Sequence, residues 1–163
     1  MAPKSQMFKT RNDLPEKTRS EMVKLLNQQL ADTFDLYSQI KQSHWNIKGI
    51  DFIQLHLLFD QLAENVLPYA DMIAERATAL GGKALGTVRL AAQNSALPEM
   101  PETVADEKEY VVLLADRMAA YAKSSRAAID TADKAEDKST ADLFTEISRS
   151  VDKDLYFLES HLQ

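Results

Sequence analysis

Apolar residues recur at helical spacing in four long stretches of this chain, and glycine, proline and charged residues cluster between them. Thr103 is expected to cap the third of the four predicted helices, which begins near residue 104. Pro68 is expected to kink the second, because proline has no N–H to donate to the carbonyl four residues earlier. No strand-like alternation competes with this pattern, so the chain is predicted to be all-α. The predicted helices span about residues 15–47, 51–80, 104–133 and 139–162.

One stripe of each of the first two helices is expected to face the core, because its apolar residues follow each other at near-helical spacing. In the first helix the stripe comprises Met22, Leu26, Leu30, Phe34 or Tyr37, Ile40 and His44. In the second helix it comprises Leu55, Phe59, Leu62, Val66, Ile73, Ala77 and Leu80.

The lengths of the connections predict how the helices are arranged. About three residues join the first two helices around Gly49, and equally few join the last two around residues 136–138, so each pair forms an antiparallel hairpin. The connection over residues 81–102 is too long for a hairpin and carries a short helical pattern near residues 88–96. Two hairpins joined by one long crossover are typical of a ferritin-like four-helix bundle.

Length and composition limit the alternatives. The 163 residues suffice for one domain with a sizeable core, which we place at residues 15–163, after a flexible basic tail over residues 1–14. The absence of cysteine excludes a disulfide framework, a zinc–thiolate site and an iron–sulfur cluster. No apolar run approaches the length of a membrane span, and the N-terminus is polar. We therefore expect a cytoplasmic protein without a membrane partner.

The net charge of −6 argues against a general nucleic-acid binder and mildly favours binding of cations. The charge is uneven, however, because Lys4, Lys9 and Arg11 all precede the first acidic residue, Asp13.

Two histidines and three carboxylates are the candidate metal ligands. A helix rises about 1.5 Å per residue, so His56 and Asp71 lie roughly 22 Å apart along the second helix. Ligands of one transition metal each lie about 2 Å from it, so both ends cannot bind the same ion within one chain. If they share a metal, a two-fold axis near residues 65–66 brings the histidine end of one chain to the acidic end of another. The candidate ligands are His44, His56, Asp60, Asp71 and Glu75.

Each of these residues also has a simpler explanation. A lone histidine on an apolar stripe, such as His44, is usually a hydrogen-bonded core residue. Asp71 and Glu75 are one turn apart, and such acids are mostly solvated or paired with a base, for which Arg76 is available. As a set, nitrogen and oxygen ligands without thiolate suit iron, with zinc, manganese and cobalt as competitors. The Glu-x-x-His motif of di-iron sites inside one bundle is absent, which supports a site between subunits.

The segment KQSHWNIKG over residues 41–49 and the segment DMIAER over residues 71–76, followed by LGG, resemble the Dps family. Dps proteins are DNA-binding proteins from starved cells, also called mini-ferritins. The similarity extends from about Thr10 to Phe157.

The resemblance implies a cage of twelve identical four-helix subunits with ferroxidase centres at its two-fold interfaces. It matches His44, His56 and Asp60 to the contribution of one chain, and Asp71 and Glu75 to that of the other. Members of the family oxidise Fe(II), commonly with hydrogen peroxide, and store ferric mineral, which protects against oxidative damage.

The resemblance also implies three further roles. Trp45 is expected either to trap stray radicals near the metal site or simply to pack in the core. Three acids near the start of the fourth helix match the region of the three-fold pores through which iron enters, although the helix dipole alone favours acids there. They are Asp137, Asp142 and Glu146.

The basic segment from Lys4 to Arg19 resembles the DNA-contacting tails of some members, with Lys4, Lys9 and Arg11 as candidate contacts. Three functions stay open at this point. The chain is an iron-oxidising and iron-storing cage, a non-specific DNA-binding protein of the nucleoid with a secondary metal site, or a structural cage whose site holds zinc or no functional metal.

Overall fold

The computed structural model describes residues 6–163, and within this range the chain forms five α-helices and no strand. The all-α prediction is therefore confirmed. The helices are α1 (Glu16–Asn46), α2 (Phe52–Ala79), α3 (Val88–Asn94), α4 (Glu107–Lys134) and α5 (Lys138–Glu159).

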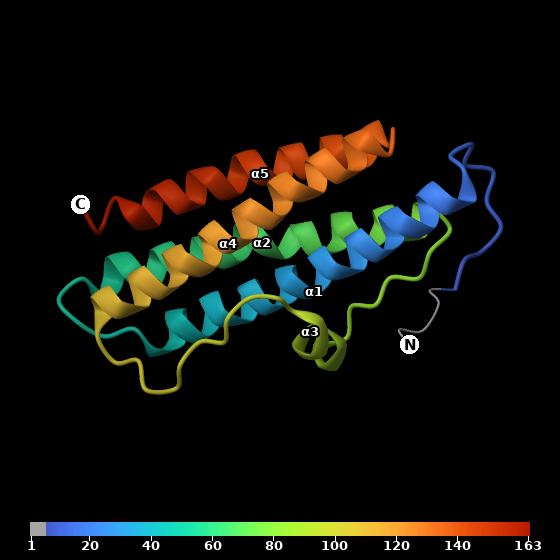
Figure 1. The fold of residues 1–163 in the computed structure, drawn as a ribbon. Coiled ribbons are helices and arrows are strands. Elements are labelled where there is room, and N and C mark those ends of the chain that lie inside the picture. The colour runs from blue at the N-terminus through green and yellow to red at the C-terminus, as the bar shows by residue number, and fades with distance from the viewer. Residues whose placement is uncertain (1–5) are drawn as a thin grey trace.

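Two helical hairpins form the bundle. Helix α1 packs against α2, α4 packs against α5, and the two hairpins meet where α1 contacts α4 and α2 contacts α5. Figure 1 shows that the crossover after α2 returns along the length of the bundle, so that α4 runs in the same direction as α2. The short helix α3 lies in this crossover and contacts α1. The ferritin-like topology with a short extra helix is therefore confirmed.

The core lies where the predicted stripes of α1 and α2 meet α4 and α5. Every predicted inward residue of α2 is buried, and in α1 only Phe34 and Tyr37 are half-buried. From the second hairpin, Tyr121 and Phe144 are among the largest fully buried side chains. The hydroxyl of Tyr121 is hydrogen-bonded to that of Thr33 over 2.7 Å, so its polar end is satisfied inside the bundle.

Two helix ends differ from the prediction by about three residues, because α5 ends at Glu159 and α4 begins later than expected. Thr103 does not cap α4. Instead the carboxylate of Asp106 accepts a hydrogen bond from the backbone N–H of Glu109, and the helix begins at Glu107. A carboxylate at this position satisfies an N–H that has no partner within the helix. Helix α2 runs without interruption from Phe52 to Ala79, with Pro68 inside it.

The segment before α1 packs against one end of the bundle. The N–H of Phe8 donates to the carbonyl of Gly81 over 2.7 Å, and Met7 packs against the core. Gly81 has φ +83°, and a Cβ there would meet the Phe8 carbonyl at 2.8 Å, so this close approach favours glycine. The described part of the predicted tail therefore contacts the bundle. Lys4 lies outside the described residues.

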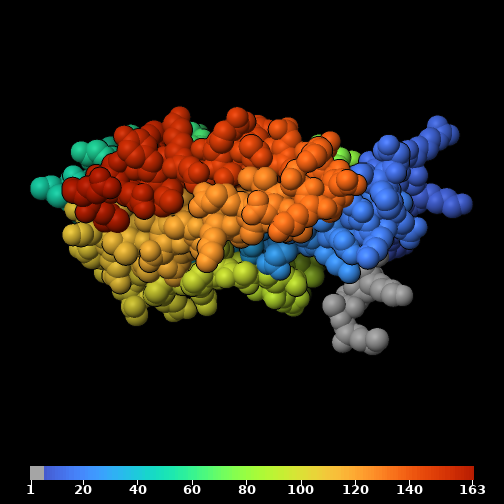
Figure 2. All heavy atoms as spheres, turned by 45° about the horizontal axis from the view of Figure 1, so that its top comes forward, coloured from blue at the N-terminus to red at the C-terminus, as the bar shows by residue number. Residues whose placement is uncertain are grey.

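The turn between α1 and α2 projects at the opposite end of the molecule from this N-terminal segment (Figure 2). His44 and His56 lie beside that turn, whereas Asp71 and Glu75 lie towards the other end of α2. Among the described residues, no helix is long and apolar enough to cross a bilayer.

Candidate metal centre

The tight turn between α1 and α2 brings two histidine rings together. The ring of His44, at the end of α1, stacks on that of His56, near the start of α2, with centroids 3.8 Å apart and planes 21° from parallel. Nδ1 of His44 lies 2.7 Å from the backbone carbonyl oxygen of His56, and Nδ1 of His56 lies 2.9 Å from that of His44. Each histidine therefore holds the other in place.

These two hydrogen bonds determine which ring nitrogen is free. A carbonyl oxygen can only accept, so each Nδ1 must carry the proton. In the neutral rings the lone pair then lies on Nε2, which is the form that binds a metal ion. The simpler explanation of His44, a core histidine satisfied by one hydrogen bond, accounts for Nδ1. It leaves Nε2 of both rings available.

Asp60 lies one turn after His56 and reaches the same place. Its Oδ1 is 3.8 Å from Nε2 of His44, a separation that one ion can span when it lies about 2 Å from each atom. Nζ of Lys41 donates to the same oxygen over 2.6 Å. This hydrogen bond is the main reason that the pKa of Asp60 is lowered, and the carboxylate is therefore ionised at neutral pH.

The other two predicted ligands are exposed carboxylates on α2. Asp71 and Glu75 are one turn apart, and neither forms an ion pair with another residue in the range 6–163. Arg76, their expected partner, instead donates to Asp137 over 2.6 Å and to Thr140 over 2.9 Å. The alternative that this base neutralises the acidic pair is therefore wrong.

The structure does not bring all five predicted ligands together within one chain. Over residues 6–163, no three histidine, cysteine, aspartate or glutamate side chains lie close enough to hold one metal ion. His44, His56 and Asp60 lie together near one end of α2, and Asp71 and Glu75 lie towards the other end, at a separation that the helix fixes.

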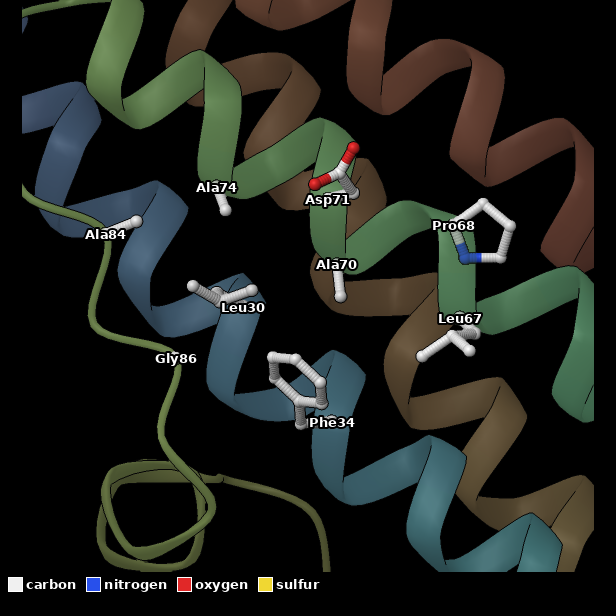
Figure 3. Close-up of a pocket in the computed structure, with 9 residues that line it drawn as sticks. All are labelled: Leu30, Phe34, Leu67, Pro68, Ala70, Asp71, Ala74, Ala84 and Gly86. Atoms are coloured by element: carbon white, nitrogen blue, oxygen red, sulfur yellow. The ribbon is translucent and has the colours of Figure 1, made fainter.

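An apolar groove of about 440 Å³ adjoins Asp71 on the outer face of α1 and α2. Figure 3 shows Leu30 and Phe34 of α1 along one side of it and Leu67 and Ala70 of α2 along the other, with Asp71 beside them. The half-buried state of Phe34 follows from its position in this groove. The sequence pattern could not distinguish this position from a core position, because both are apolar and fall on one helical stripe.

Trp45 does not pack in the core of the described chain, since 69% of its surface is exposed. Trp45 follows His44 at the end of α1, and the ammonium of Lys41 lies 5.9 Å from its ring centroid. Core packing as the explanation of Trp45 is therefore wrong for the single chain.

The three predicted pore acids differ in their surroundings. Asp142 and Glu146 are exposed and lie one turn apart on α5. Asp137 is only 1% exposed, caps α5 by accepting from the N–H of Thr140, and pairs with Arg76. The carboxylate of Asp137 is thus occupied by structural contacts, and it is not a free pore ligand within this chain.

The candidate DNA contacts also differ. Lys9 and Arg11 are exposed. Arg19, at the end of the predicted basic segment, is buried and donates to the carbonyls of Leu14 and Leu80, each over 3.0 Å. Arg19 therefore links the N-terminal segment to the end of α2, and its guanidinium is not available to bind a DNA phosphate.

Comparison with known proteins identifies the family. The model of the ferritin-like domain family matches residues 23–163. A curated relative from Agrobacterium fabrum, named DNA protection during starvation protein, is 41% identical over 155 residues, which cover 95% of this chain and 96% of the relative. DNA protection during starvation protein 1 of Deinococcus radiodurans is 33% identical over 147 residues, covering 90% and 71% of the two chains.

Solved structures agree with the sequence comparison. DpsC from Streptomyces coelicolor superposes with a TM-score of 0.92 at 30% identity and covers 97% of this chain and 92% of its own. A Dps homologue from the archaeon Halobacterium salinarum gives a TM-score of 0.91 at 25% identity, covering 100% and 90%. This chain therefore belongs to the Dps family of ferritin-like proteins.

Proposed function

We propose that this protein is a ferroxidase that oxidises Fe(II) at sites shared between two subunits and stores the ferric product inside a cage. Iron storage and protection from oxidative damage are the general functions of its family. The observation that carries the proposal is the pair of half-sites. Two histidines are held with Nε2 free at one end of α2, and at the other end are two carboxylates that form no ion pair within residues 6–163.

A two-fold axis between residues 65 and 66 places Asp60 opposite the partner's Asp71 and His56 opposite the partner's Glu75. Exposed apolar side chains on the same stripe of α2 support this packing. Ile53, Leu57 and Leu67 are 55%, 60% and 43% exposed in the single chain. Leu57 comes opposite the partner's Ala74, which lines the groove of Figure 3. Packing two α2 helices antiparallel thus covers apolar surface while it completes both metal sites.

The ligand set suits oxidation of iron. Neutral imidazoles bind Fe(II), and the carboxylates stabilise Fe(III) more strongly because the product ion carries one more positive charge. Two neighbouring Fe(II) ions each give up one electron. Hydrogen peroxide accepts both electrons together with two protons and leaves as two molecules of water. Because the electrons arrive as a pair, no hydroxyl radical is released.

Lys41 and Trp45 support this site. Before iron binds, the ammonium of Lys41 partly neutralises Asp60, which otherwise stands as an unpaired charge beside the rings. When iron binds, it competes with Lys41 for the same oxygen. Trp45 directly follows His44 at the end of α1 and is exposed, and we propose that it gives an electron to a radical that escapes the site.

We further propose a cage of twelve chains, into which iron passes along pores lined by Asp142 and Glu146. Carboxylates focused in a narrow channel raise the local concentration of a cation. Zinc is expected to compete for the oxidation site, because it accepts the same ligands but cannot be oxidised.

A second candidate function is direct binding of DNA, which the exposed Lys9 and Arg11 favour. Contacts of this kind are to phosphates, so the binding is expected to be independent of sequence and to weaken steeply with salt. Such binding would give the protein a location at the nucleoid.

The test of the first proposal is anaerobic loading with Fe(II), followed by addition of peroxide or oxygen while ferric absorbance is recorded. Peroxide should oxidise bound iron faster than oxygen, with about two irons consumed per peroxide. His56→Ala should lose the fast phase. His161→Ala is the matched control, because His161 is exposed near the C-terminal end of the chain and its Nδ1 lies 2.8 Å from the carbonyl oxygen of Phe157. Equal rates for His56→Ala and the native protein would reject the proposal.

A further inference from the structure

The turn between α1 and α2 is bonded to a side chain from the second hairpin. Residues 48–51 of this turn are all exposed, so they have little packing of their own to fix their position. Oε2 of Glu107, in the first turn of α4, accepts a hydrogen bond from the backbone N–H of Asp51 over 3.2 Å. Figure 1 shows that α4 begins at the end of the bundle where α1 turns into α2. Glu107 therefore links the exposed turn to the other hairpin.

Glu107 also supplies a cap that α2 lacks. Asp51 stands at the N-cap position of α2, but its side chain makes no capping hydrogen bond, and the first turn of α2 contains no acid. In a capping box, a glutamate of the same helix reaches back to the N–H of the N-cap residue. Glu107 makes this hydrogen bond from a different helix. Its negative charge is also favoured at the start of α2 by the helix dipole.

Gly49 allows the carboxylate to lie this close to the turn. Gly49 has φ +148°, a conformation that other residues rarely adopt, and a Cβ there would overlap the carboxylate of Glu107. The side chain of Glu107 thus lies over the α-carbon of Gly49 and bonds to the backbone two residues later. The shape of the turn and the position of the carboxylate depend on each other.

The geometry of the histidine pair depends on the same turn. Each Nδ1 of His44 and His56 bonds to the backbone carbonyl of the other residue, so both hydrogen bonds require the end of α1 and the start of α2 to keep their relative position. The buried Ile47 and Leu55 anchor the two helices to the core on either side of the turn. Glu107 is the side chain that fixes the exposed residues between these anchors.

We propose that Glu107 is a positioning residue for the histidine pair. It holds the turn between α1 and α2 in the conformation in which His44 and His56 both keep the proton on Nδ1 and leave Nε2 free. Glu107 acts through the backbone of Asp51, so it orders the two rings before any metal binds. The consequence for metal binding rests on the function proposed above, whereas the consequence for the rings does not.

The direct test records the tautomers of the histidine rings in the metal-free protein. The chain contains three histidines, so labelling with ¹⁵N-histidine gives a spectrum of three rings, with the exposed His161 as an internal reference. Solid-state NMR of the sedimented protein distinguishes a ring nitrogen that carries a proton from one that does not. In the native protein His44 and His56 should each show one form, with the proton on Nδ1. In Glu107→Ala both rings should show a mixture of tautomers.

Two controls separate the hydrogen bond from a general effect on α4. Glu107→Gln keeps an oxygen that can accept from Asp51, so it should retain the native spectrum. Glu109→Ala removes another exposed acid from the first turn of α4 and should also leave the rings unchanged. A native spectrum in Glu107→Ala would overturn the proposal. So would an equal change in Glu109→Ala, because the effect would then arise from the charge at the start of α4.

A further variant covers the case in which Glu107→Ala fails to assemble, which chromatography would detect from its size. Glu107→Asp keeps the negative charge at the start of α4, but its side chain is one methylene shorter and should not reach the N–H of Asp51. This variant should show the same mixture of tautomers, and a native spectrum in it would contradict the positioning role.

Binding of Co²⁺ measures the consequence for the metal site without any oxidation step, because Co²⁺ accepts the same nitrogen and oxygen ligands as Fe(II). Glu107→Ala should raise the dissociation constant for Co²⁺ about fivefold, the order expected for a lost helix cap, and Glu107→Gln should change it less than about twofold. Native affinity in Glu107→Ala, in a protein that oxidises iron, would reject the positioning role and leave the proposed function standing. A native protein with ordered rings that neither binds Co²⁺ nor oxidises iron would reject the proposed function, while the tautomers would still decide the role of Glu107.

Discussion

His44 and His56 are bound to each other's backbone, with Nδ1 of each donating to the carbonyl of the other over 2.7 and 2.9 Å. This reciprocal arrangement depends on the turn between α1 and α2, which brings the end of one helix back to the start of the next. It orients both Nε2 atoms before any metal arrives. A site with prepared ligands loses less conformational entropy on binding than one whose side chains must first be ordered.

The proposed interface can be tested at Leu57, which is 60% exposed and, in the proposed two-fold pair, comes opposite the apolar groove of the second chain. Leu57→Glu places a charge in that groove, so the two-fold pair should fail to form and iron oxidation should be lost. Leu57→Met keeps the apolar volume and should assemble normally. Light scattering after chromatography reports the size. Native-sized, active cages of Leu57→Glu would show that α2 packs elsewhere.

Asp137 should contribute to stability rather than to iron uptake. Asp137→Ala removes both the cap of α5 and the ion pair with Arg76, whereas Asp137→Asn retains a good capping residue. A lost cap costs about 0.5–2 kcal/mol, so the alanine variant should unfold at lower denaturant concentration than the asparagine variant.

The two exposed acids of α5 should behave in the opposite way. Asp142→Asn combined with Glu146→Gln should slow iron uptake at low ionic strength and leave the unfolding midpoint nearly unchanged, because exposed charges contribute little to stability. Uptake at the native rate would mean that iron enters by another route.

The stability of the protein should fall as the pH rises through the range in which Asp154 loses its proton. Burial raises the pKa of Asp154 from 3.8, its value in an unfolded chain, to about 6 in the folded chain. Between these two pH values the folded state therefore binds a proton that the unfolded state has lost. The contribution of Asp154 to the free energy of unfolding is therefore most favourable below about pH 4, and it decreases as the pH rises to about 6.

Asp154→Asn cannot ionise, so it should remove this decrease and raise the metal-free unfolding free energy at pH 7 by on the order of 2 kcal/mol. Denaturant titrations at fixed protein concentration with a chelator present measure the difference. An identical pH dependence in the native protein and the variant would show that Asp154 is not the group responsible.

DNA binding is best tested without truncation, because Met7 and Leu14 pack on the bundle and the carbonyl of Leu14 accepts from the buried Arg19. Lys9→Gln with Arg11→Gln removes two exposed charges and leaves these contacts intact. Any DNA binding seen by gel retardation should weaken. The dependence of its affinity on salt concentration should become less steep, by the equivalent of about two phosphate contacts per chain. Unchanged binding would locate the DNA contact elsewhere, and no binding at low salt would end this hypothesis.

The fold was predictable because every level of the sequence agreed. Helical spacing, two short connections and one long crossover all specify the same bundle, and Tyr121 and Phe144 fill its centre. The predicted capping residue of α4 was wrong because Thr103 and Asp106 are both suitable N-cap residues. Glu109, three residues after Asp106, is the feature that indicates the observed choice, since acids in this pattern are common at helix starts.

The site was predictable in part. The separation of His56 from Asp71 follows from helical rise alone, and the sequence therefore specified two half-sites. Side-chain partners were not predictable in this way. Arg76 follows Glu75 in the sequence but bonds to Asp137, and Asp154 has no neighbour in sequence that indicates its burial. Such pairings depend on the rotation of α5 against α2, which periodicity alone does not determine.

The shared site is tested most directly by mixing two inactive chains. His44→Ala/His56→Ala and Asp71→Ala/Glu75→Ala should each assemble into cages that do not oxidise Fe(II). In a mixed two-fold pair, one site has native residues from both chains and the other is damaged on both sides. Random mixing makes about half of the pairs mixed, so roughly a quarter of all sites should be native. The initial Fe(II) oxidation rate per cage after co-assembly should therefore recover to about a quarter of the native rate, whereas mixed cages as inactive as their parents would contradict a site shared between subunits.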